Sequence, residues 1–182
     1  MASDSKRFKA EVLPHIDAAY NLARWLSRSA ADAEDVVQDA LLLAFRNFDA
    51  QRGPNTRAWL LAIVRNSFLS TVRRAAPHAG KTESIDALDA GAAPAALVSV
   101  ESPEADAITA DGARSLNEVL ERLPEDFREM LVLRELEGLS YREISTVTAA
   151  PIGTVMSRLA RARAAFRAEW RRLNGGNDDV LP

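Results

Sequence analysis

The side chains best suited to chemistry in this sequence are arginines, which gather in two stretches. Residues 57–74 carry four arginines and no acid, and residues 140–174 carry seven arginines against Glu143 and Glu169. Arginines concentrated in this way bind polyanions such as nucleic acids, through phosphate oxygens or guanine edges. The net charge of −3 does not oppose this interpretation, because local charge steers a polyanion more than the total does.

Residue types needed for metal, redox or covalent catalysis are scarce. The 182 residues include no cysteine, and the two histidines, His15 and His78, lie far apart. No nucleophile triad, phosphate-binding loop or carboxylate cluster with metal spacing occurs. We therefore expect no enzyme activity, no metal and no cofactor. An apolar run of ~20 residues and the apolar core of a signal peptide are also missing, so we expect a cytoplasmic protein without membrane insertion.

The elements that must position the arginines are predicted to be helices. Strand signals are weak, whereas apolar residues recur at helical spacing along most of the chain. The predicted helices span residues 8–27, 32–48, 56–74, 112–122, 125–136, 140–148 and 152–172. Asp32 is expected to cap the second of them, and Gly138 to end the fifth. The fold class is therefore predicted to be all-α.

Residues 77–110 separate the two halves of the chain. They are rich in alanine, glycine, serine and proline, carry Lys81 against six acids, and contain no aromatic residue. Such a composition without apolar periodicity predicts a flexible acidic linker. We therefore expect two small helical domains, at 1–76 and 111–174, followed by a disordered tail at 175–182.

A helix-turn-helix is predicted at residues 140–167. Ser140 can cap a short helix, and a turn containing Pro151 and Gly153 leads into a longer one. The apolar stripe of the longer helix is Ile152, Val155, Leu159, Ala162 and Phe166, and its opposite face carries Thr154, Ser157, Arg158, Arg161 and Ala165. A small, polar and arginine-bearing face suits entry into a major groove. A plain helical hairpin with a solvated arginine face is the alternative, and the excess of arginine over acid weighs against it.

Blocks in both halves resemble the extracytoplasmic-function (ECF) sigma factors of bacterial RNA polymerase. In the C-terminal half, LPEDFRE, LRELEGLSYREI and PIGTVMSRLARAR are similar to the family's −35-reading domain. In the N-terminal half, DAEDVVQDALLLAF resembles the polymerase-binding helix, and TRAWLLAIVRNSFLSTVRR resembles the helix that reads the −10 element. Two unrelated blocks in the family's order make the resemblance specific. It implies a factor that directs core polymerase to promoters and helps to open them.

The resemblance implies roles for residues in the N-terminal half. An acidic face is expected to dock on core polymerase through Asp32, Glu34, Asp35, Gln38 and Asp39. A solvated first turn, favoured by the helix dipole, is the alternative for the first three acids of this set. The residues expected to hold single-stranded DNA at −10 are Asn55, Arg65, Asn66, Ser67, Ser70, Arg73 and Arg74. Trp59 also matches the family, but its place in the apolar stripe favours core packing.

In the C-terminal half, the resemblance and the polar helix face together assign DNA contacts at −35. The residues are Arg134, Thr154, Met156, Ser157, Arg158, Ala160, Arg161 and Arg163. The sequence departs from the family at Met156, where a basic residue is usual, and a methionine cannot bind phosphate. Base reading is therefore expected to depend on Ser157 and Arg161. Arg158 has an alternative role, a salt bridge to a neighbouring helix.

The partners that the resemblance implies are core RNA polymerase, promoter DNA (duplex at −35 and single strand at −10) and an anti-sigma factor that buries the DNA-facing surfaces. The acidic linker could imitate RNA in the polymerase's RNA channel or serve as a solvated spacer. A free-standing helix-turn-helix regulator is the main alternative function, but it leaves the blocks in residues 32–74 without a role. An interaction-only adaptor is another, and it would tolerate Arg161→Ala.

Overall fold

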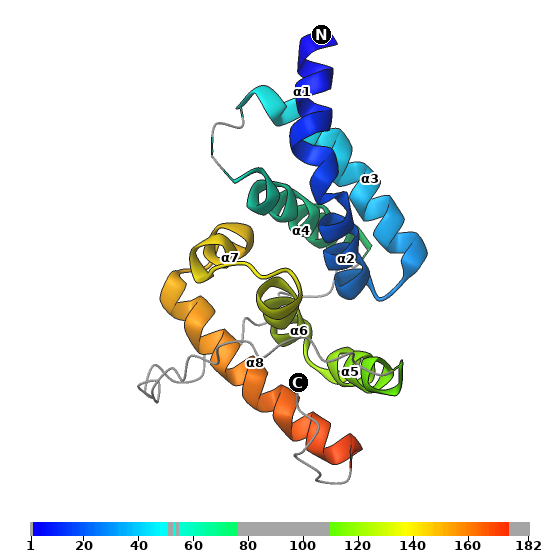
Figure 1. The fold of residues 1–182 in the computed structure, drawn as a ribbon, viewed down its shortest axis with the longest axis vertical. Coiled ribbons are helices and arrows are strands. Elements are labelled where there is room, and N and C mark those ends of the chain that lie inside the picture. Colours follow the sequence, from blue (N-terminus) through cyan, green and yellow to red (C-terminus); the bar gives the residue numbers. More distant parts are fainter. Residues whose placement is uncertain (1, 51–52, 54, 76–109, 175–182) are drawn as a thin grey trace.

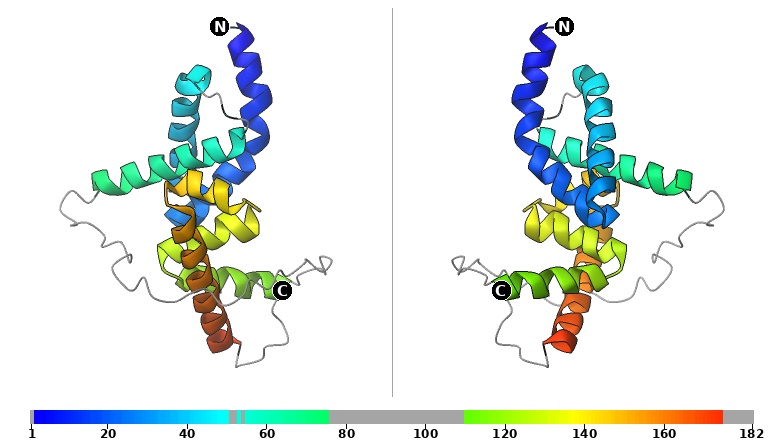
Figure 2. Two further views of the ribbon diagram at one scale, coloured as in Figure 1. Left: turned by 90° about the vertical axis from the view of Figure 1, so that its left-hand side faces the viewer. Right: turned by 90° about the vertical axis from the view of Figure 1, so that its right-hand side faces the viewer.

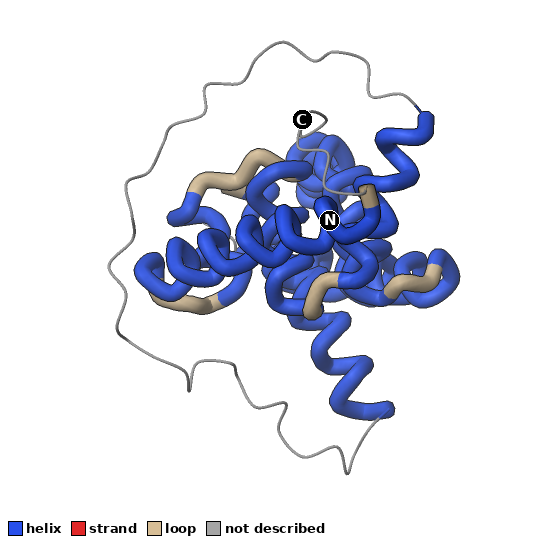
Figure 3. The backbone as a smooth tube through the Cα atoms, turned by 90° about the horizontal axis from the view of Figure 1, so that it is seen from below, coloured by secondary structure: helices blue, strands red, loops and turns tan. Residues whose placement is uncertain are grey.

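The computed structural model describes residues 2–50, 53, 55–75 and 110–174, and these residues form helices and short loops with no strand (Figures 1 and 3). The predicted all-α fold is confirmed. The predicted linker, apart from residue 110, and the tail at 175–182 lie outside the described residues. Within the described part of the chain, no helix is long and apolar enough to cross a membrane. The same part contains no group of three acidic or histidine side chains arranged to hold a metal ion.

The first helical segment is interrupted at Pro14. Instead of one helix over 8–27, the chain forms α1 (Ala2–Val12), a 3-10 turn η1 (Leu13–His15) and α2 (Ile16–Ser27). Proline has no N–H to donate and its ring clashes with the preceding turn, so a continuous α-helix is broken there. The break leaves Leu13 exposed while Val12 is buried.

The second helix, α3 (Ala30–Asn47), begins earlier than predicted. Its cap is Ser29, whose Oγ accepts a hydrogen bond from the Asp32 backbone N–H at 3.3 Å. The prediction of Asp32 as the cap was wrong because Ser29 already has the extended backbone that a cap requires. Asp32 lies in the first turn instead, where a negative charge is favoured by the helix dipole. A short 3-10 turn, η2 (Phe48–Ala50), follows α3.

Helix α4 (Thr56–Ala75) supplies much of the core of the first half. Asn55 caps it, because its Oδ1 accepts a hydrogen bond from the Ala58 N–H at 2.9 Å. The buried side of α4 packs against α2 and α3. Trp59 is part of this packing, with its ring centroid 6.4 Å from that of Phe48, as its position in the apolar stripe predicted. The last turns of α4 project from the body of the molecule (Figure 2).

The second half begins with α5 (Ala110–Arg122) and α6 (Glu125–Leu131). A π-helical turn, η4 (Val132–Leu136), extends α6 and completes the segment predicted as one helix over 125–136. Gly138 has a φ of 63°, a left-handed conformation that glycine adopts without steric cost. The chain reverses there, and the Leu139 N–H donates to the Leu133 carbonyl at 3.0 Å. Gly138 therefore ends this segment, as predicted.

The predicted helix-turn-helix is formed by α7 (Tyr141–Thr148) and α8 (Ile152–Leu173). Ser140 and Glu143 make a capping box: the Ser140 Oγ accepts from the Glu143 N–H, and the Glu143 carboxylate accepts from the Ser140 N–H. The turn passes through Ala149, whose φ is 54°. In the predicted inward stripe of α8, Val155, Leu159 and Ala162 are buried and Phe166 is half-buried, whereas Ile152, the first residue of the helix, is exposed.

The two halves pack directly against each other. Helix α7 lies on α4, and α6 with η4 lies against α2, so a single buried core runs through both halves (Figures 1 and 2). The sequence predicted two domains that a linker allows to separate. In this structure the domains share a boundary, and the residues on that boundary determine which predicted site residues are accessible.

Candidate nucleic-acid interface

The predicted polymerase-docking residues form one exposed surface on α3. Asp32, Glu34, Asp35, Gln38 and Asp39 are all exposed. The same side of the helix continues through Leu42 and Phe45, whose exposed fractions are 53 % and 52 %. Because residues four and seven positions beyond Gln38 share its face, α3 presents an acidic surface that merges into an apolar one.

Two of the predicted −10 residues are held by the other half of the molecule. The Arg65 Nε donates to Glu129 Oε1 at 2.6 Å, and its Nη2 donates to Oε2 at 3.3 Å. Asn55, besides capping α4, donates through Nδ2 to the carboxylate of Glu143. Glu129 is only 5 % exposed, and burial raises the pKa of its carboxyl group while Arg65 opposes the rise. In this arrangement the side chains of Asn55 and Arg65 are not free to contact a DNA strand.

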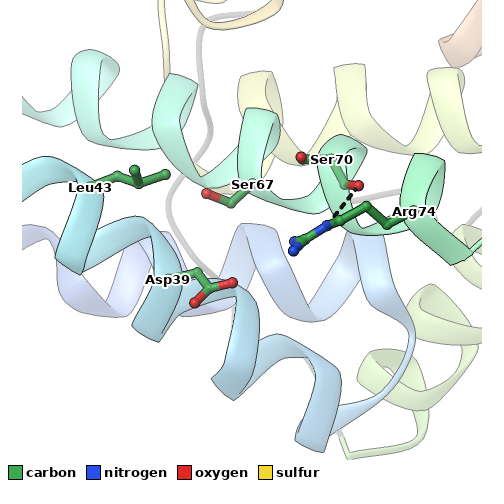
Figure 4. A pocket seen from close by; sticks show the side chains of 5 residues that line it. All are labelled: Asp39, Leu43, Ser67, Ser70 and Arg74. Atoms are coloured by element: carbon green, nitrogen blue, oxygen red, sulfur yellow. Dashed lines mark hydrogen bonds between the residues drawn. The ribbon is translucent and has the colours of Figure 1, made fainter.

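The remaining predicted −10 residues lie along the outer part of α4. Asn66, Ser70, Arg73 and Arg74 are exposed. Ser67 differs, since it is 6 % exposed and its Oγ has no hydrogen-bond partner. It lies in a hollow between α3 and α4 that is lined by Asp39, Leu43, Ser67, Ser70 and Arg74 (Figure 4). Because the Ser67 hydroxyl is buried in this arrangement, it is not accessible to a DNA strand.

The predicted −35 residues on α8 surround an exposed small-residue face. Ser157 and Ala160 are exposed, while Thr154, Met156, Arg158 and Arg161 are half-buried. The Ser157 Oγ donates to the Thr154 carbonyl at 3.0 Å, and its lone pairs remain available to a base edge. The small side chains on this face would let the backbone of α8 approach DNA closely, as a recognition helix requires.

Two other predicted −35 residues, Arg134 and Arg163, have structural partners within their own half. The Arg134 Nη1 donates to the Leu139 carbonyl at 2.8 Å, and its guanidinium lies 5.0 Å from the centre of the Tyr141 ring. Arg163 pairs with Glu135 at 2.8 Å. These contacts tie η4 to the start of α7 and to α8. Both arginines thus hold the helices of the helix-turn-helix in position through contacts within the second half.

Three residues at the boundary of the halves, Asn21, Arg57 and Glu137, were not predicted as site residues from the sequence. Glu137 is buried, and its carboxylate accepts from Arg57 Nη2 and from Asn21 Nδ2, each at 2.5 Å. Nothing local marks these residues, because the partners lie far apart along the chain. The one available signal was the set of acids at residues 125–137 in an otherwise basic half.

Comparisons with known proteins bear on both halves. The model of Sigma-70 region 2 matches residues 12–77, and that of Sigma-70 region 4 matches residues 113–166. The RNA polymerase sigma-H factor of Pseudomonas aeruginosa is 33 % identical over 168 residues, which cover 90 % of this chain and 86 % of that one. The ECF RNA polymerase sigma-E factor of Escherichia coli is 34 % identical over 172 residues, with the same shares covered.

The chain belongs to the extracytoplasmic-function sigma factors. The family predicted from the sequence blocks is confirmed, and with it the function: this sigma factor directs core RNA polymerase to promoters and aids their opening.

Two solved structures resemble this sigma factor over most of its length. The sigma factor RpoE of Bartonella quintana, in complex with the anti-sigma factor NepR, superposes with a TM-score of 0.68 at 29 % identity, covering 91 % of this chain and 98 % of that one. CnrH, in complex with the cytosolic domain of CnrY, gives a TM-score of 0.60 at 26 % identity, covering 90 % and 87 %. Both matches extend across the two halves of this sigma factor.

Proposed function

We propose that this sigma factor uses three separate surfaces during initiation. The exposed acidic side of α3 binds core polymerase, the outer side of α4 holds the non-template strand at −10, and the exposed side of α8 reads duplex DNA at −35. The observation that carries this assignment is on α3. Five polar side chains predicted to dock are all exposed there, while Ala33, Val36, Val37 and Ala40 on the opposite side are buried.

The physical demands of each step fit the side chains. Oriented docking on a basic partner surface is favoured by an acidic patch beside an apolar one. Single-stranded DNA is held by cations and by groups that read base edges, which Arg73, Arg74 and Asn66 supply on an exposed helix side. Duplex reading needs small residues and an arginine that can pair with guanine, which Ser157, Ala160 and Arg161 supply.

The partners that follow are core RNA polymerase, promoter DNA and an anti-sigma protein. The solved relative in complex with an anti-sigma factor supports the last of these. The sigma factor itself performs no bond chemistry in this scheme, since the polymerase makes the RNA, and it acts in the cytoplasm where the polymerase lies. A free-standing helix-turn-helix regulator is disfavoured because such a protein has no use for a matched sigma region 2.

Run-off transcription tests the proposal. Purified core polymerase is incubated with this sigma factor and a library of genomic promoter fragments, and the transcripts are sequenced. We expect a small set of specific transcripts whose start sites share −10 and −35 elements. Core polymerase alone and core polymerase with its primary sigma factor are the controls. Failure to obtain any specific transcript, with a core enzyme that is active with its primary sigma factor, would contradict the proposal.

A further inference from the structure

The exposed side of α8 consists of a line of small residues with a different flank on either side. Gly153, Ser157, Ala160 and Ala164 follow one another at helical spacing, and all of them are exposed. They lie opposite the buried stripe of α8, so they mark the line along which the helix comes closest to DNA in the proposed function. The side chains on the two flanks of this line are those that reach the bases and phosphates on either side of the groove.

One flank, which we call the apolar flank, begins with Ile152 and Met156. Ile152 is the first residue of α8 and is 41 % exposed. Met156 is half-buried and lies one turn farther along the same flank. A single exposed isoleucine is ordinary on a protein surface. This one, however, lies beside a methionine on the helix that the proposed function places in the major groove.

The apolar flank carries no positive charge that could hold a phosphate near its start. No arginine or lysine occurs among residues 149–157. Arg163, two turns beyond Met156 on the same flank, is paired with Glu135 at 2.8 Å between Nη2 and Oε1. The apolar flank therefore presents hydrocarbon and thioether to the groove where a phosphate contact would need a cation.

The opposite flank is polar. Thr154 and Arg161 lie on it two turns apart, and both are half-buried. Hydroxyl and guanidinium groups form hydrogen bonds with base edges and with phosphates. The two flanks of α8 therefore suit different partners in one groove, because only the polar flank can form such hydrogen bonds.

The apolar group that the bases present in the major groove is the C5 methyl group of thymine. Apolar side chains in contact with this methyl group distinguish thymine from the other bases. Ile152 and Met156 are separated by about 6 Å along the axis of α8. Bases one or two steps apart in a strand have a similar separation, since the rise per base is about 3.4 Å. Both side chains can therefore contact thymines of the same strand.

We propose that Ile152 and Met156 bind the C5 methyl groups of thymines in one strand of the −35 element, so that this sigma factor selects thymine there by apolar contact. The proposal rests on the proposed function of α8 and adds a base preference that Ser157 and Arg161 do not supply. A cation in place of Met156 would hold a phosphate of any sequence, whereas the methionine makes the contact depend on the base.

The test compares thymine with deoxyuridine, which lacks only the C5 methyl group. Holoenzyme is assembled from core polymerase and the full chain. A promoter found by run-off transcription is synthesised with each thymine of its −35 element, on either strand, replaced singly by deoxyuridine. Competition binding gives the affinity of the holoenzyme for each duplex. At one or more positions the wild type should bind the uracil duplex about fourfold more weakly, the effect of removing one methyl group from a buried apolar contact.

Two double variants identify the side chains responsible. Ile152→Ser with Met156→Gln makes the apolar flank polar, and this variant should bind the thymine and uracil duplexes equally. Ile152→Val with Met156→Leu keeps the flank apolar and should retain the preference for thymine. The matched control is Leu13→Gln, which makes an exposed apolar residue of the first half polar. This control should match the wild type on both duplexes.

Three results overturn the proposal. The first is equal binding of thymine and uracil duplexes by the wild type at every −35 position. The second is a preference for thymine that persists unchanged in the polar variant, because the methyl group is then bound by other residues. The third is weaker binding of core polymerase by the polar variant while its preference for thymine is intact, which makes the apolar flank a protein contact.

Failure of the methyl contact can be distinguished from failure of the proposed function. If single base-pair changes in the −35 element still weaken binding while uracil is tolerated, the −35 role of α8 stands and only the methyl contact fails. If neither base-pair changes in the −35 element nor Arg161→Ala alters promoter binding, the −35 role of α8 is itself contradicted.

Discussion

At the scale of single residues, Arg161 is the side chain on which base reading at −35 most depends. It is half-buried beside the exposed Ser157 and Ala160 on α8. We expect Arg161→Ala to cost ~1–3 kcal/mol of discrimination against a changed −35 base, because a bidentate arginine contact is lost. The measurement is run-off transcription from promoters that differ at single −35 positions. Arg167→Ala, an exposed arginine farther along the same helix, is the control and should leave the preference intact.

At Met156, a substitution should add a DNA contact rather than remove one. Met156 is half-buried on α8, at a position where the resemblance to the family leads us to expect a basic residue. Met156→Lys should strengthen binding to −35 duplexes of any sequence and make the slope of log affinity against log salt steeper by about 0.9, the effect of one added phosphate contact. Titrations at several salt concentrations measure this slope. Met156→Leu should behave as the wild type, and an unaltered slope in the lysine variant would place this position away from the DNA backbone.

At the scale of elements, α3 combines a buried apolar side with an exposed acidic one. Asp35 and Asp39 are one turn apart on the exposed side. We expect Asp35→Lys with Asp39→Lys to weaken association with core polymerase by tenfold or more, since like charges would face each other across the contact. Binding is measured by fluorescence anisotropy at two salt concentrations. The control is Asp17→Lys, an exposed acid on α2, and equal weakening by both variants would exclude a specific docking role for α3.

Helix α7 depends on its capping box, which makes its stability sensitive to acid. Hydrogen bonds from the Ser140 side chain and backbone lower the pKa of the Glu143 carboxyl group, with further contributions from Asn55 and Arg57 and an opposing one from burial. A lowered pKa in the folded state means that Glu143 stabilises the fold above its usual pKa of ~4.3 and that this contribution is lost as the pH falls through the folded value.

We therefore expect the stability difference between the wild type and Glu143→Gln to be largest at neutral pH and to shrink as the pH drops below about 4.3. Urea unfolding followed by circular dichroism, at a series of pH values, gives this difference. Glu118→Gln removes an exposed acid from α5 and provides the comparison. If the stability difference stays constant across the pH series, the capping contacts do not lower the pKa of Glu143.

At the scale of the whole molecule, the two halves share one core and a set of buried charge pairs. Halves coupled in this way should unfold together, so we expect a single cooperative transition for the wild type in scanning calorimetry at neutral pH. Glu129→Gln with Glu137→Gln should split or broaden that transition, because each half then unfolds with less support from the other. Two resolved transitions in the wild type would show that the contact contributes little coupling.

The sequence alone was enough to predict the helices, the helix-turn-helix and the family. Apolar spacing, the Ser140 cap and Gly138 act over a few residues, so they can be recognised without tertiary structure. Two local features were misjudged for local reasons. The break at Pro14 was passed over in favour of apolar spacing, and Ser29, three residues ahead of Asp32, was the better cap.

Only the tertiary structure decided which site residues are accessible. Arg65 and Glu129 are 64 positions apart, and Arg57 and Glu137 are 80 apart. The composition of residues 77–110 predicted separable halves and contains nothing about what either half touches. A charge pair depends on the distance and burial of two side chains, and neither follows from their spacing along the chain. The sequence thus determined which family this sigma factor belongs to, and the packing of its halves determined which predicted site residues, such as Asn55 and Arg65, are already engaged within the chain.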